Sequence, residues 1–572
     1  MHRNIFTTQK KNQAVCHLFN LFVDTILLHK HVHDLLSKIE IKTIMKQFLS
    51  FSLLLILSAS ISAQDLNELW HHKDLSSDNI PGVSLKQAKD YLDGRPSKKV
   101  VVAIIDSGYE LDHDAFQTNT WVNKGEIAGN GKDDDGNGYI DDVNGWNFIG
   151  GPEGNVINET MELTREYRRL KAKYENVSTG KSAEYKYWRE IEERYLADSE
   201  EAIGSAKGFF DRYNGVAFQY KLLAGYAMVD TLSMEALESI DSQDSVVMAA
   251  DNYFTRIMGY LGGKASLEDV LSVFEGGLAY YDYQGNYAYN DEFDPRDIVG
   301  DDPTDFRNRN YGNNRIDEVG GFGGSHGTHV AGIVGGKVGE TTIGITDNVE
   351  FMFVRAIPSG DERDKDVGNA IRYAADNGAQ VINMSFGKDY SPNKEYVWEA
   401  VKYAESKGVL MVHAAGNDGK NNDENPSFPD GSITKSKKSK NWIEVGASSE
   451  NYNEDLAAGF SNYGRKNVDL FAPGVQIMSA VPENTYKANS GTSMAAPVVA
   501  GVSALLLSYF PDLEASEVKE ILLQSATKVD LDVTKPGSED LINFSKLSKT
   551  GGIVNAYEAV KLADQRFKIE SR

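Results

Sequence analysis

The stretch GTSMAAP, residues 491–497, decides how this chain is interpreted. It places Ser493 at the start of a helix built from small residues, and Pro497 falls in the first turn, where its missing N–H costs little. The first N–H groups of a helix have no partner within it, and the helix dipole is positive at that end. A serine in this position is set to react with a carbonyl group, because the helix end stabilises negative charge on the carbonyl oxygen.

Two further segments supply the groups that such a serine needs. The sequence DSG at 106–108 ends an apolar run over 100–105, and HGTH at 326–329 opens another small-residue helix. A serine hydroxyl is a poor nucleophile unless a neutral imidazole takes its proton, and a buried carboxylate holds that imidazole in the useful tautomer. We therefore expect Ser493 to be the nucleophile, His326 the general base and then acid, and Asp106 its orienting partner.

The order Asp106, His326, Ser493, together with the flanking residues, resembles the subtilisin-like serine proteases, or subtilases. The resemblance covers roughly residues 65–150 and 297–565. It implies a serine endopeptidase that hydrolyses peptide bonds through an acyl-enzyme. It also assigns the Asn417 side chain to the oxyanion hole, with the Ser493 backbone N–H as the second donor. The alternative interpretation of Asn417 is a turn residue after a strand.

The same resemblance implies where protein or peptide substrates bind. In subtilases an extended peptide pairs with the enzyme backbone as an added strand. The matching segment is NMSFG at 383–387. A second backbone edge near Ser359 and Gly360 would pair with the other side of the substrate. The run over 381–386 is also a core strand, and both interpretations hold at once. The residues that should line the first pocket are Ser385, Phe386, Gly387, Ala414, Ala415 and Gly416.

Apolar runs that alternate with helical patterns predict an α/β fold with a mostly parallel sheet flanked by helices. Asp106 and Asn417 each fall just after an apolar run, and ligands of such sheets bind beyond the carboxyl ends of the strands. This placement supports both assignments without reference to any motif. The runs lie at 351–356, 381–385, 409–414 and 443–448, with helices around 367–376 and 396–407.

The acidic stretch DDDGNGYIDD, residues 133–142, predicts a structural calcium site. Its oxygen ligands alternate, and a glycine occupies the sixth position, as in the first half of an EF-hand loop. Position twelve is Asn144 instead of glutamate, so the loop is not a regular EF-hand; several subtilases carry a similar calcium loop. The alternative is a polar turn that binds no metal. A second acidic stretch at 297–305 is equally open between a metal site and such a turn. The expected ligands are Asp133, Asp135, Asn137, Tyr139, Asp141 and Asp142.

The main departure from the family is the separation of Asp106 and His326 by 220 residues, whereas compact members separate them by a few tens. We expect a helical insertion over 151–296, between catalytic parts at 64–150 and 297–566. Helical patterns lie at 162–175, 182–200, 246–260 and 267–274. The insertion is either an appended subdomain without a catalytic role or a lid or wall beside the cleft.

Residues 45–63 have the pattern of a secretory signal peptide, with Lys46 near the start, an apolar core to Leu57 and small residues to Ala63. We expect a secreted or periplasmic protein with no stable membrane insertion after signal removal. Residues 1–44 resemble nothing, and our hypothesis is that Met45 is the true start; a native peptide from 1–44 would contradict it. The mature chain would then lack Cys16, the one cysteine of the sequence. Without a cysteine it could form no disulfide.

Composition agrees with a large soluble enzyme, because 41% of the 572 residues are hydrophobic. The net charge of −25 argues against nucleic acid or an anionic membrane surface as a partner, since both need basic patches. Two other classes of protein would share some of these features. A pseudoprotease that binds peptides without cutting would usually lose a catalytic residue, but four are present: Asp106, His326, Asn417 and Ser493. A calcium-dependent adhesive protein would explain the acidic loops but not the catalytic segments.

Overall fold

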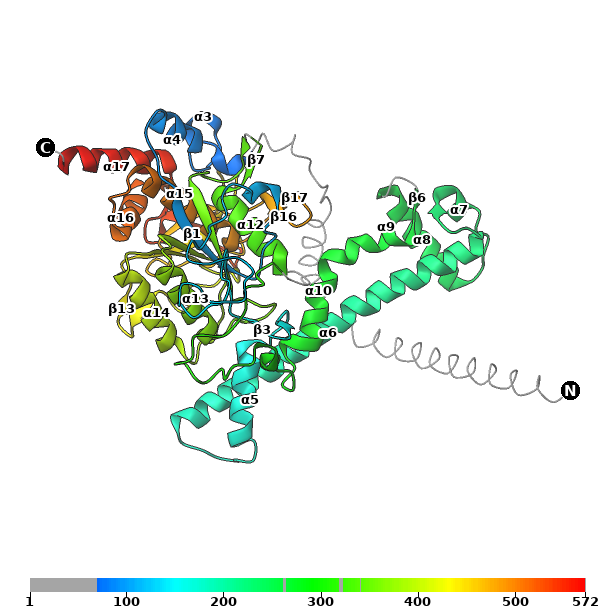
Figure 1. Ribbon diagram of the computed structural model, residues 1–572. Coiled ribbons are helices and arrows are strands. Elements are labelled where there is room, and N and C mark those ends of the chain that lie inside the picture. Colours follow the sequence, from blue (N-terminus) through cyan, green and yellow to red (C-terminus); the bar gives the residue numbers. More distant parts are fainter. Residues whose placement is uncertain (1–68, 261–263, 318–322, 340, 571–572) are drawn as a thin grey trace. The chain divides into compact units, whose positions relative to one another are not determined.

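The computed structural model describes residues 69–260, 264–317, 323–339 and 341–570, so the expected signal peptide lies outside the described residues. A nine-stranded sheet organises this part of the chain, in the order β18-β21-β15-β14-β11-β10-β1-β9-β2 (Figure 1). All neighbours are parallel except β18 and β21. The strands are β1 Val100–Asp106, β2 Gly145–Asn147, β9 Val349–Arg355, β10 Val381–Met384, β11 Leu410–Ala414, β14 Trp442–Ser448, β15 Leu470–Pro473, β18 Thr527–Lys528 and β21 Gly552–Ile553.

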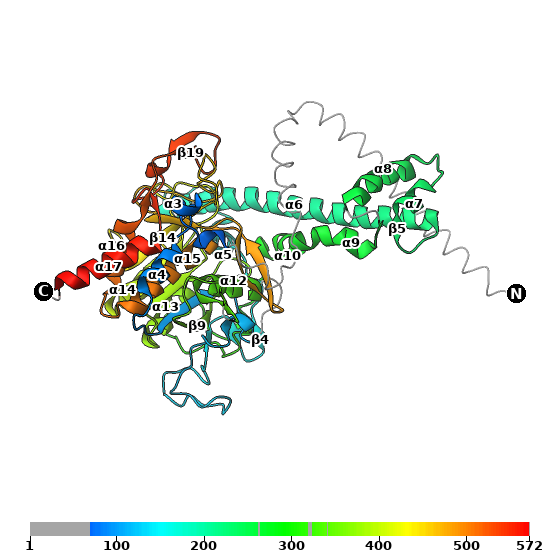
Figure 2. The same ribbon diagram turned by 90° about the horizontal axis from the view of Figure 1, so that it is seen from above.

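The sheet is buried on both faces, as the apolar runs predict for parallel strands. Alternate side chains of β1 enter different cores: Val102 and Ile104 pack on one side, Ala103 and Ile105 on the other. Helices α12 (Gly323–Gly335) and α15 (Thr492–Tyr509) belong to the first core; α13 (Asp364–Asp376) and α14 (Lys394–Ser406) belong to the second (Figure 2). The predicted α/β fold is therefore confirmed, and its strands and helices begin and end within a few residues of the predicted positions.

Helix α15 carries Ser493 in its first turn and runs through the centre of the first core. It is the one described helix that is long and apolar enough to cross a membrane, but 89% of it is buried within the protein. Its apolar composition is explained by the core that it fills. The remaining helices of this part are α3 Leu75–Asp78, α4 Leu85–Leu92, α16 Ala515–Ser525 and α17 Ala556–Glu570, with short 3-10 turns at Trp70–His72, Asp114–Phe116 and Phe544–Lys546.

Helices also fill the region between β4 (Gly154–Asn155) and α11 (Arg296–Val299). Helix α6 (Ala183–Ala227) has 45 residues, so it spans about 68 Å and continues well past the predicted end at 200. Its first turns pack on α5 (Glu162–Tyr174) through stacked aromatic rings, and its last turns form a separate core with α8. The other elements are β5 Leu232–Ser233, α7 Met234–Glu238, α8 Ser245–Tyr260, β6 Lys264–Ala265, α9 Leu267–Leu271, a 3-10 turn Ser272–Phe274, α10 Glu275–Tyr283 and a π-helix Gln284–Ala288.

Short two-stranded antiparallel ribbons form separate sheets outside the nine-stranded one. The ribbon β16–β17 packs on α12, and its first strand contributes to the first core. The ribbons among the described residues, besides β5–β6, are β3 Gly150–Gly151 with β4, β7 Lys337–Val338 with β8 Thr341–Thr342, β12 Ser432–Thr434 with β13 Lys437–Lys438, β16 Ile477–Val481 with β17 Thr485–Asn489, and β19 Asp532–Thr534 with β20 Leu541–Asn543.

The topology brings three predicted site residues to one edge of the sheet. Strands β1, β10 and β11 are consecutive neighbours, and all run in the same direction. Asp106 ends β1, Ser385 follows β10, and Asn417 lies three residues after β11. The carboxyl ends of parallel strands are where open α/β sheets bind ligands.

Candidate active site

The side chains of His326 and Asp106 form the central contact of the site. The imidazole Nδ1 lies 2.7 Å from Asp106 Oδ1, although the residues are 220 positions apart. The same carboxylate oxygen accepts hydrogen bonds from the N–H and the hydroxyl of Ser107. Asp106 is 2% exposed, so its charge is poorly screened by solvent. A buried carboxylate at Nδ1 leaves Nε2 as the ring nitrogen that can accept a proton.

The protonation of His326 reflects two opposing effects. Burial lowers the pKa of the imidazole, but the charge of Asp106 and the hydrogen bond to it raise the pKa further, and the net result lies above the ordinary value of 6.5. The neighbouring His329 differs, because burial lowers its pKa to about 3 and its Nε2 contacts the Lys487 carbonyl at 2.9 Å. Of the two histidines, only His326 is therefore tuned to exchange a proton near neutral pH.

Ser493 lies in the first turn of α15, after Gly491 and Thr492. Its hydroxyl donates to the Ser385 carbonyl at 3.1 Å, and the Ser385 hydroxyl donates back to the Ser493 carbonyl at 2.9 Å. The hydrogen bonds of the described residues do not include one between Ser493 and His326. Contacts between a nucleophile and its general base are often long in the absence of substrate and tighten only when substrate binds.

Asn417 is oriented by its own hydrogen bonds. Its side-chain carbonyl accepts from the Thr492 N–H at 2.8 Å and from the Thr492 hydroxyl at 2.9 Å. Asn417 lines the same cavity as Ser493, and its amide NH₂ is not used in the contact with Thr492. The chain reaches this position through Gly416, whose φ of +105° favours glycine and whose missing Cβ would lie 2.4 Å from Asn462.

A cavity of about 240 Å³ opens beside Ser493. Of the residues predicted to line the first pocket, Phe386, Gly387, Ala414 and Gly416 do so, and Ser385 and Ala415 are buried behind its wall. The lining also includes Lys388, Asp389, Asp418 and Ser427. Sequence reasoning missed Lys388, Asp389 and Ser427. Ser427 approaches from a distant loop, and no local pattern in the sequence indicates that approach.

The opposing edge near Ser359 already has a strand partner. The Ser359 N–H donates to the Ile157 carbonyl at 2.7 Å, and its carbonyl accepts from the Glu159 N–H at 2.8 Å. Gly360 allows this contact, because a Cβ there would lie 2.3 Å from the Glu159 carbonyl. The segment before α5 therefore uses the backbone groups that the resemblance offered to a substrate.

The acidic loop brings carboxylates together as a calcium ligand set requires. Oxygens of Glu126, Asp133 and Asp135 lie within 4.8 Å of one another, and hard oxygen donors of this kind suit Ca²⁺. Glu126 was not predicted, because it lies seven residues before the alternating pattern begins. Its carboxylate also accepts from the N–H groups of Asp134 and Asp141.

The other predicted ligands have different roles in the structure. Asn137 donates to Asp135 and to Asp142, which therefore lie near the acidic group. Asp141 accepts from the N–H groups of residues 130 and 131, and the Tyr139 hydroxyl donates to the Arg309 carbonyl. Burial raises the pKa of Asp142 to about 6, and the Tyr373 hydroxyl donates to it at 2.6 Å.

The second acidic stretch forms ion pairs instead. Asp301 contacts Arg296 and Lys365, each at 2.5 Å, and all three side chains are almost fully buried. Its carboxylate is therefore paired with two cations, and a metal site in this stretch stays an untested prediction.

The sequence model of the subtilase family matches residues 97–545, well over half of the chain. The chain belongs to the subtilase family. Similar curated proteins include a thermophilic serine proteinase of Bacillus sp. strain AK1, 40% identical over 36% of this subtilase and 47% of the relative. Subtilisin DY of Bacillus licheniformis is 37% identical over 36% of this subtilase and 72% of the relative.

The matched region covers 47% of the thermophilic serine proteinase and 30% of the cell wall-associated protease of Bacillus subtilis, so the chain spans less than half the length of these two relatives. One solved structure, of a mutant of the protease domain of PatA, is 28% identical and covers 43% of this subtilase and 82% of that chain, with a TM-score of 0.35.

Proposed function

We propose that this subtilase is a secreted serine endopeptidase that hydrolyses peptide bonds in protein or peptide substrates. The observation that carries the proposal is the 2.7 Å contact between His326 and Asp106 at the sheet edge where Ser385 and Asn417 also lie. The family and its named proteinase relatives support the same activity. Asp106, Ser385 and Asn417 come from distant parts of the sequence, and neighbouring parallel strands bring them to the same edge of the sheet.

Each residue has a role in the proposed reaction. Ser493 Oγ attacks the substrate carbonyl carbon while His326 Nε2 takes the hydroxyl proton. The tetrahedral intermediate collapses to an acyl-enzyme as the imidazolium gives its proton to the leaving amine. Water then attacks the ester with His326 again as the base, which releases the acid and restores Ser493. Asp106 stabilises the imidazolium that forms in each half of the reaction.

Asn417 stabilises the oxyanion in this proposal. Its carbonyl is held by Thr492 and its side chain lines the cavity beside Ser493, which supports the NH₂ group as the donor. Because the donor is already oriented, no reorganisation is needed when negative charge develops. The Ser493 N–H at the start of α15 is the second donor, and the helix dipole adds to it.

Calcium is the proposed structural ion, held by Glu126, Asp133 and Asp135 with further oxygens from the 137–142 segment. A bound ion would neutralise carboxylates that otherwise repel one another, and would tie residues 126–142 together. This cross-link would replace the disulfides that the mature chain lacks. The proposal also divides the chain into a signal peptide at 45–63, catalytic parts at 64–150 and 297–566, and a helical insertion at 151–296.

The decisive experiment compares the protein from Gln64 onward with its Ser493→Ala variant on casein, each with and without a calcium chelator. We expect wild type to cleave casein and Ser493→Ala to turn over about a millionfold more slowly, the scale set by subtilisin itself. Loss of cleavage on chelation would support the calcium site. A well-folded wild type that leaves casein intact in calcium would contradict the proposal and favour a peptide-binding pseudoprotease.

A further inference from the structure

A second cavity, of about 490 Å³, lies at the end of the sheet opposite to Ser493. Its lining includes Trp442, the first residue of β14, and Asp469, which directly precedes β15. These positions are the amino ends of two parallel neighbours, whereas Ser385 follows the carboxyl end of its strand. Strand β14 has seven residues, so roughly 20 Å separates its two ends. Small-molecule sites have volumes of about 300–1,000 Å³, so this cavity has room for a ligand away from the proposed active site.

Five lysines line this cavity and make it positively charged. They come from distant parts of the sequence, since β13 and the turn after it, the loop before β15, helix α16 and the segment before β21 all contribute. The protein as a whole has a net charge of −25, which repels anions from most of its surface. The cavity therefore has the opposite sign to the molecule as a whole. We call it the basic cavity, and its lysines are Lys438, Lys440, Lys466, Lys519 and Lys549.

The carboxylates that line the basic cavity already have partners. Each of them has a cationic group or an N–H donor within 3.5 Å. The contacts are those of Asp469 with Lys519 and Lys549, of Glu444 with the Trp442 indole, and of Glu520 with Arg566. Because these carboxylates are occupied, none is left to neutralise the other lysines of the cavity.

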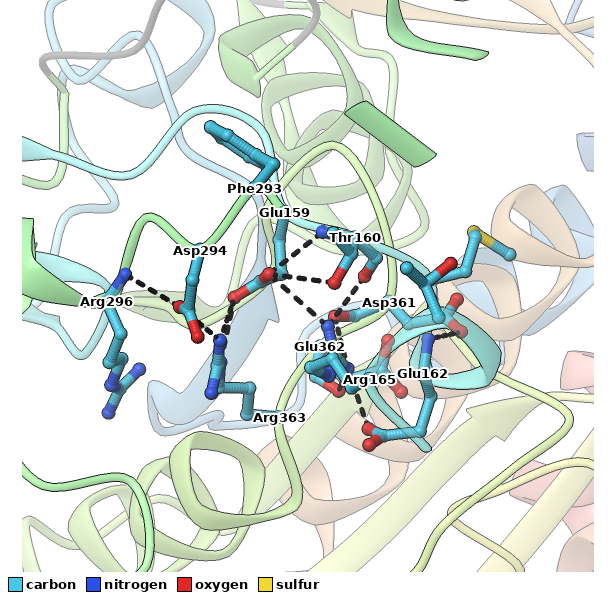
Figure 3. Close-up of polar contacts among 12 residues, drawn as sticks. Glu159, Thr160, Glu162, Arg165, Phe293, Asp294, Arg296, Asp361, Glu362 and Arg363 are labelled. Atoms are coloured by element: carbon cyan, nitrogen blue, oxygen red, sulfur yellow. Dashed lines mark hydrogen bonds and ion pairs between the residues drawn. The ribbon is translucent and has the colours of Figure 1, made fainter. Parts of the chain in front are cut away.

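Three of the five lysines have no such partner. The ion pairs of the described residues include none with the ammonium group of Lys438, Lys440 or Lys466, and all three residues are exposed. By contrast, the arginines around α5 pair with carboxylates, as Arg165 does with Glu162 at 2.6 Å (Figure 3). The basic cavity has two more ammonium groups than carboxylates, and this excess charge is accessible to a ligand.

A half-buried lysine of the basic cavity experiences the same excess charge. The side chain of Lys519 is 14% exposed. Burial lowers the pKa of its ammonium group below 10.5, and the charges of Lys549 and Lys438 lower the pKa further, while Asp469 opposes them. An anion in the cavity would offset the repulsion among these ammonium groups. Ser516, in the first turn of α16, lines the same cavity and adds a hydroxyl donor.

We propose that the basic cavity binds a phosphate or sulfate group, held by the ammonium groups of Lys438, Lys440 and Lys466. Lysine is a compact point charge with three rotatable donors, and its hydrogen bonds to phosphate oxygens are charge-assisted. The bound group is either a free ion or the monoester of a small molecule such as a sugar, for which the cavity has space. This site does not depend on the proposed peptidase activity.

Isothermal titration calorimetry on Ser493→Ala tests the proposal, since this variant lacks the proposed nucleophile and should not digest itself. Inorganic phosphate and glucose 6-phosphate are the probes, and sodium chloride and glucose are the blanks. At low ionic strength, where screening is weak, we expect one phosphate to bind per chain. Tighter binding of glucose 6-phosphate would identify a monoester as the ligand, and equal or tighter binding of inorganic phosphate would identify the free ion.

The three unpaired lysines are then changed together. Lys438→Gln, Lys440→Gln and Lys466→Gln remove the excess charge, and we expect phosphate to bind at least about tenfold more weakly. Arginine at the same three positions retains the charge and should change the Kd less than about threefold. Because the three side chains are exposed, both variants should fold, and circular dichroism checks this.

The matched control carries Lys181→Gln, Lys186→Gln and Lys221→Gln. These lysines are exposed, and the ion pairs of the described residues include none of them, so the control loses the same charge outside the basic cavity. Its Kd for phosphate should match that of the parent. An equal loss of affinity in this control, an unchanged Kd without the three cavity lysines, or no binding of phosphate up to about 10 mM would overturn the proposal.

Discussion

Ser493 stands where backbone and side-chain contacts have already fixed its surroundings. Its hydroxyl and carbonyl both contact Ser385, its neighbour Thr492 holds Asn417, and the backbone of Ser385 continues into the first pocket. A substrate therefore meets groups whose positions do not depend on its arrival. The proposed mechanism requires one change, in which the Ser493 hydroxyl leaves the Ser385 carbonyl and contacts His326.

The pKa of His326 sets the acid side of the activity profile. A general base must be neutral. Burial lowers the pKa of His326, but the charge of Asp106 and the hydrogen bond to it together raise it above 6.5. We expect kcat/KM to fall tenfold per pH unit on the acid side, with a midpoint above pH 6.5, because the protonated imidazole cannot accept the serine proton. The measurement is a pH profile of kcat/KM, with circular dichroism at each pH to establish folding. A midpoint below pH 6 would contradict the assignment.

Asn417 is expected to act on the transition state and not on substrate binding. Asn417→Leu should lower kcat by about 10²–10³, a scale that comes from subtilisin, and change KM by less than about threefold. Steady-state kinetics on a single peptide amide separates the two constants. Asn425→Ala, on an exposed loop nearby, is the control and should retain wild-type kinetics. A rise in KM with kcat preserved would make Asn417 a binding residue instead.

At the scale of elements, the sequence predicted the strands and helices of the sheet closely, because buried parallel strands are continuous apolar runs. It missed the part of α6 after residue 200, which contains Gly204, Gly208, Gly215 and Gly225. Each glycine costs about 1 kcal/mol in a helix, and a local pattern cannot show the tertiary contacts that offset this. Those contacts come from a core that α8 completes.

The ion pairs of α5 were outside the reach of sequence analysis for a similar reason. Glu162 and Lys388 are 226 residues apart, and each alone looks like an ordinary surface charge. The choice between an appended subdomain and a wall beside the cleft stays an untested prediction. Glu126 was missed in the same way, because its carboxylate returns to a loop that begins seven residues later.

Burial of Glu362 predicts a pH-dependent stability. Its folded pKa of about 7 exceeds the value of 4.5 that it has when exposed, so the folded state favours the protonated form. The contribution to stability is present below about pH 4.5 and is lost as the pH rises through 7. The groups that face it are Lys388, Asp361, Asp364, Glu162 and Arg165.

We therefore expect Glu362→Gln, made in the Ser493→Ala background to prevent self-digestion, to raise the Tm by a few degrees at pH 8. At pH 5 its Tm should match that of the parent, because the parent carboxyl is already protonated there. Thermal melts at the two pH values measure the difference, with Glu450→Gln as the control. An equal effect at both pH values would show that charge is not the cause.

At the scale of the whole molecule, the acidic calcium loop predicts a stability that depends on the metal. An ion that binds only the folded state at 100 times its Kd adds about 2.7 kcal/mol. Chelation should then lower the Tm of Ser493→Ala by about 5 °C or more, since about 1 kcal/mol corresponds to 2–4 °C in a domain of 150–250 residues. Differential scanning calorimetry checks this, and Glu126→Gln with Asp133→Asn should abolish the response. A Tm unaffected by chelator and by added calcium would contradict the site.

Helix α15 serves two purposes at once, since it presents Ser493 and fills the centre of the first core. Its backbone amides should therefore exchange with deuterium only when the entire catalytic part opens, among the slowest in the chain. We therefore expect no local unfolding that disorders Ser493 while the rest of the catalytic part stays folded. Heat inactivation should follow global unfolding in a single step, while the separate core formed by α6 and α8 is free to open earlier without loss of the reacting groups.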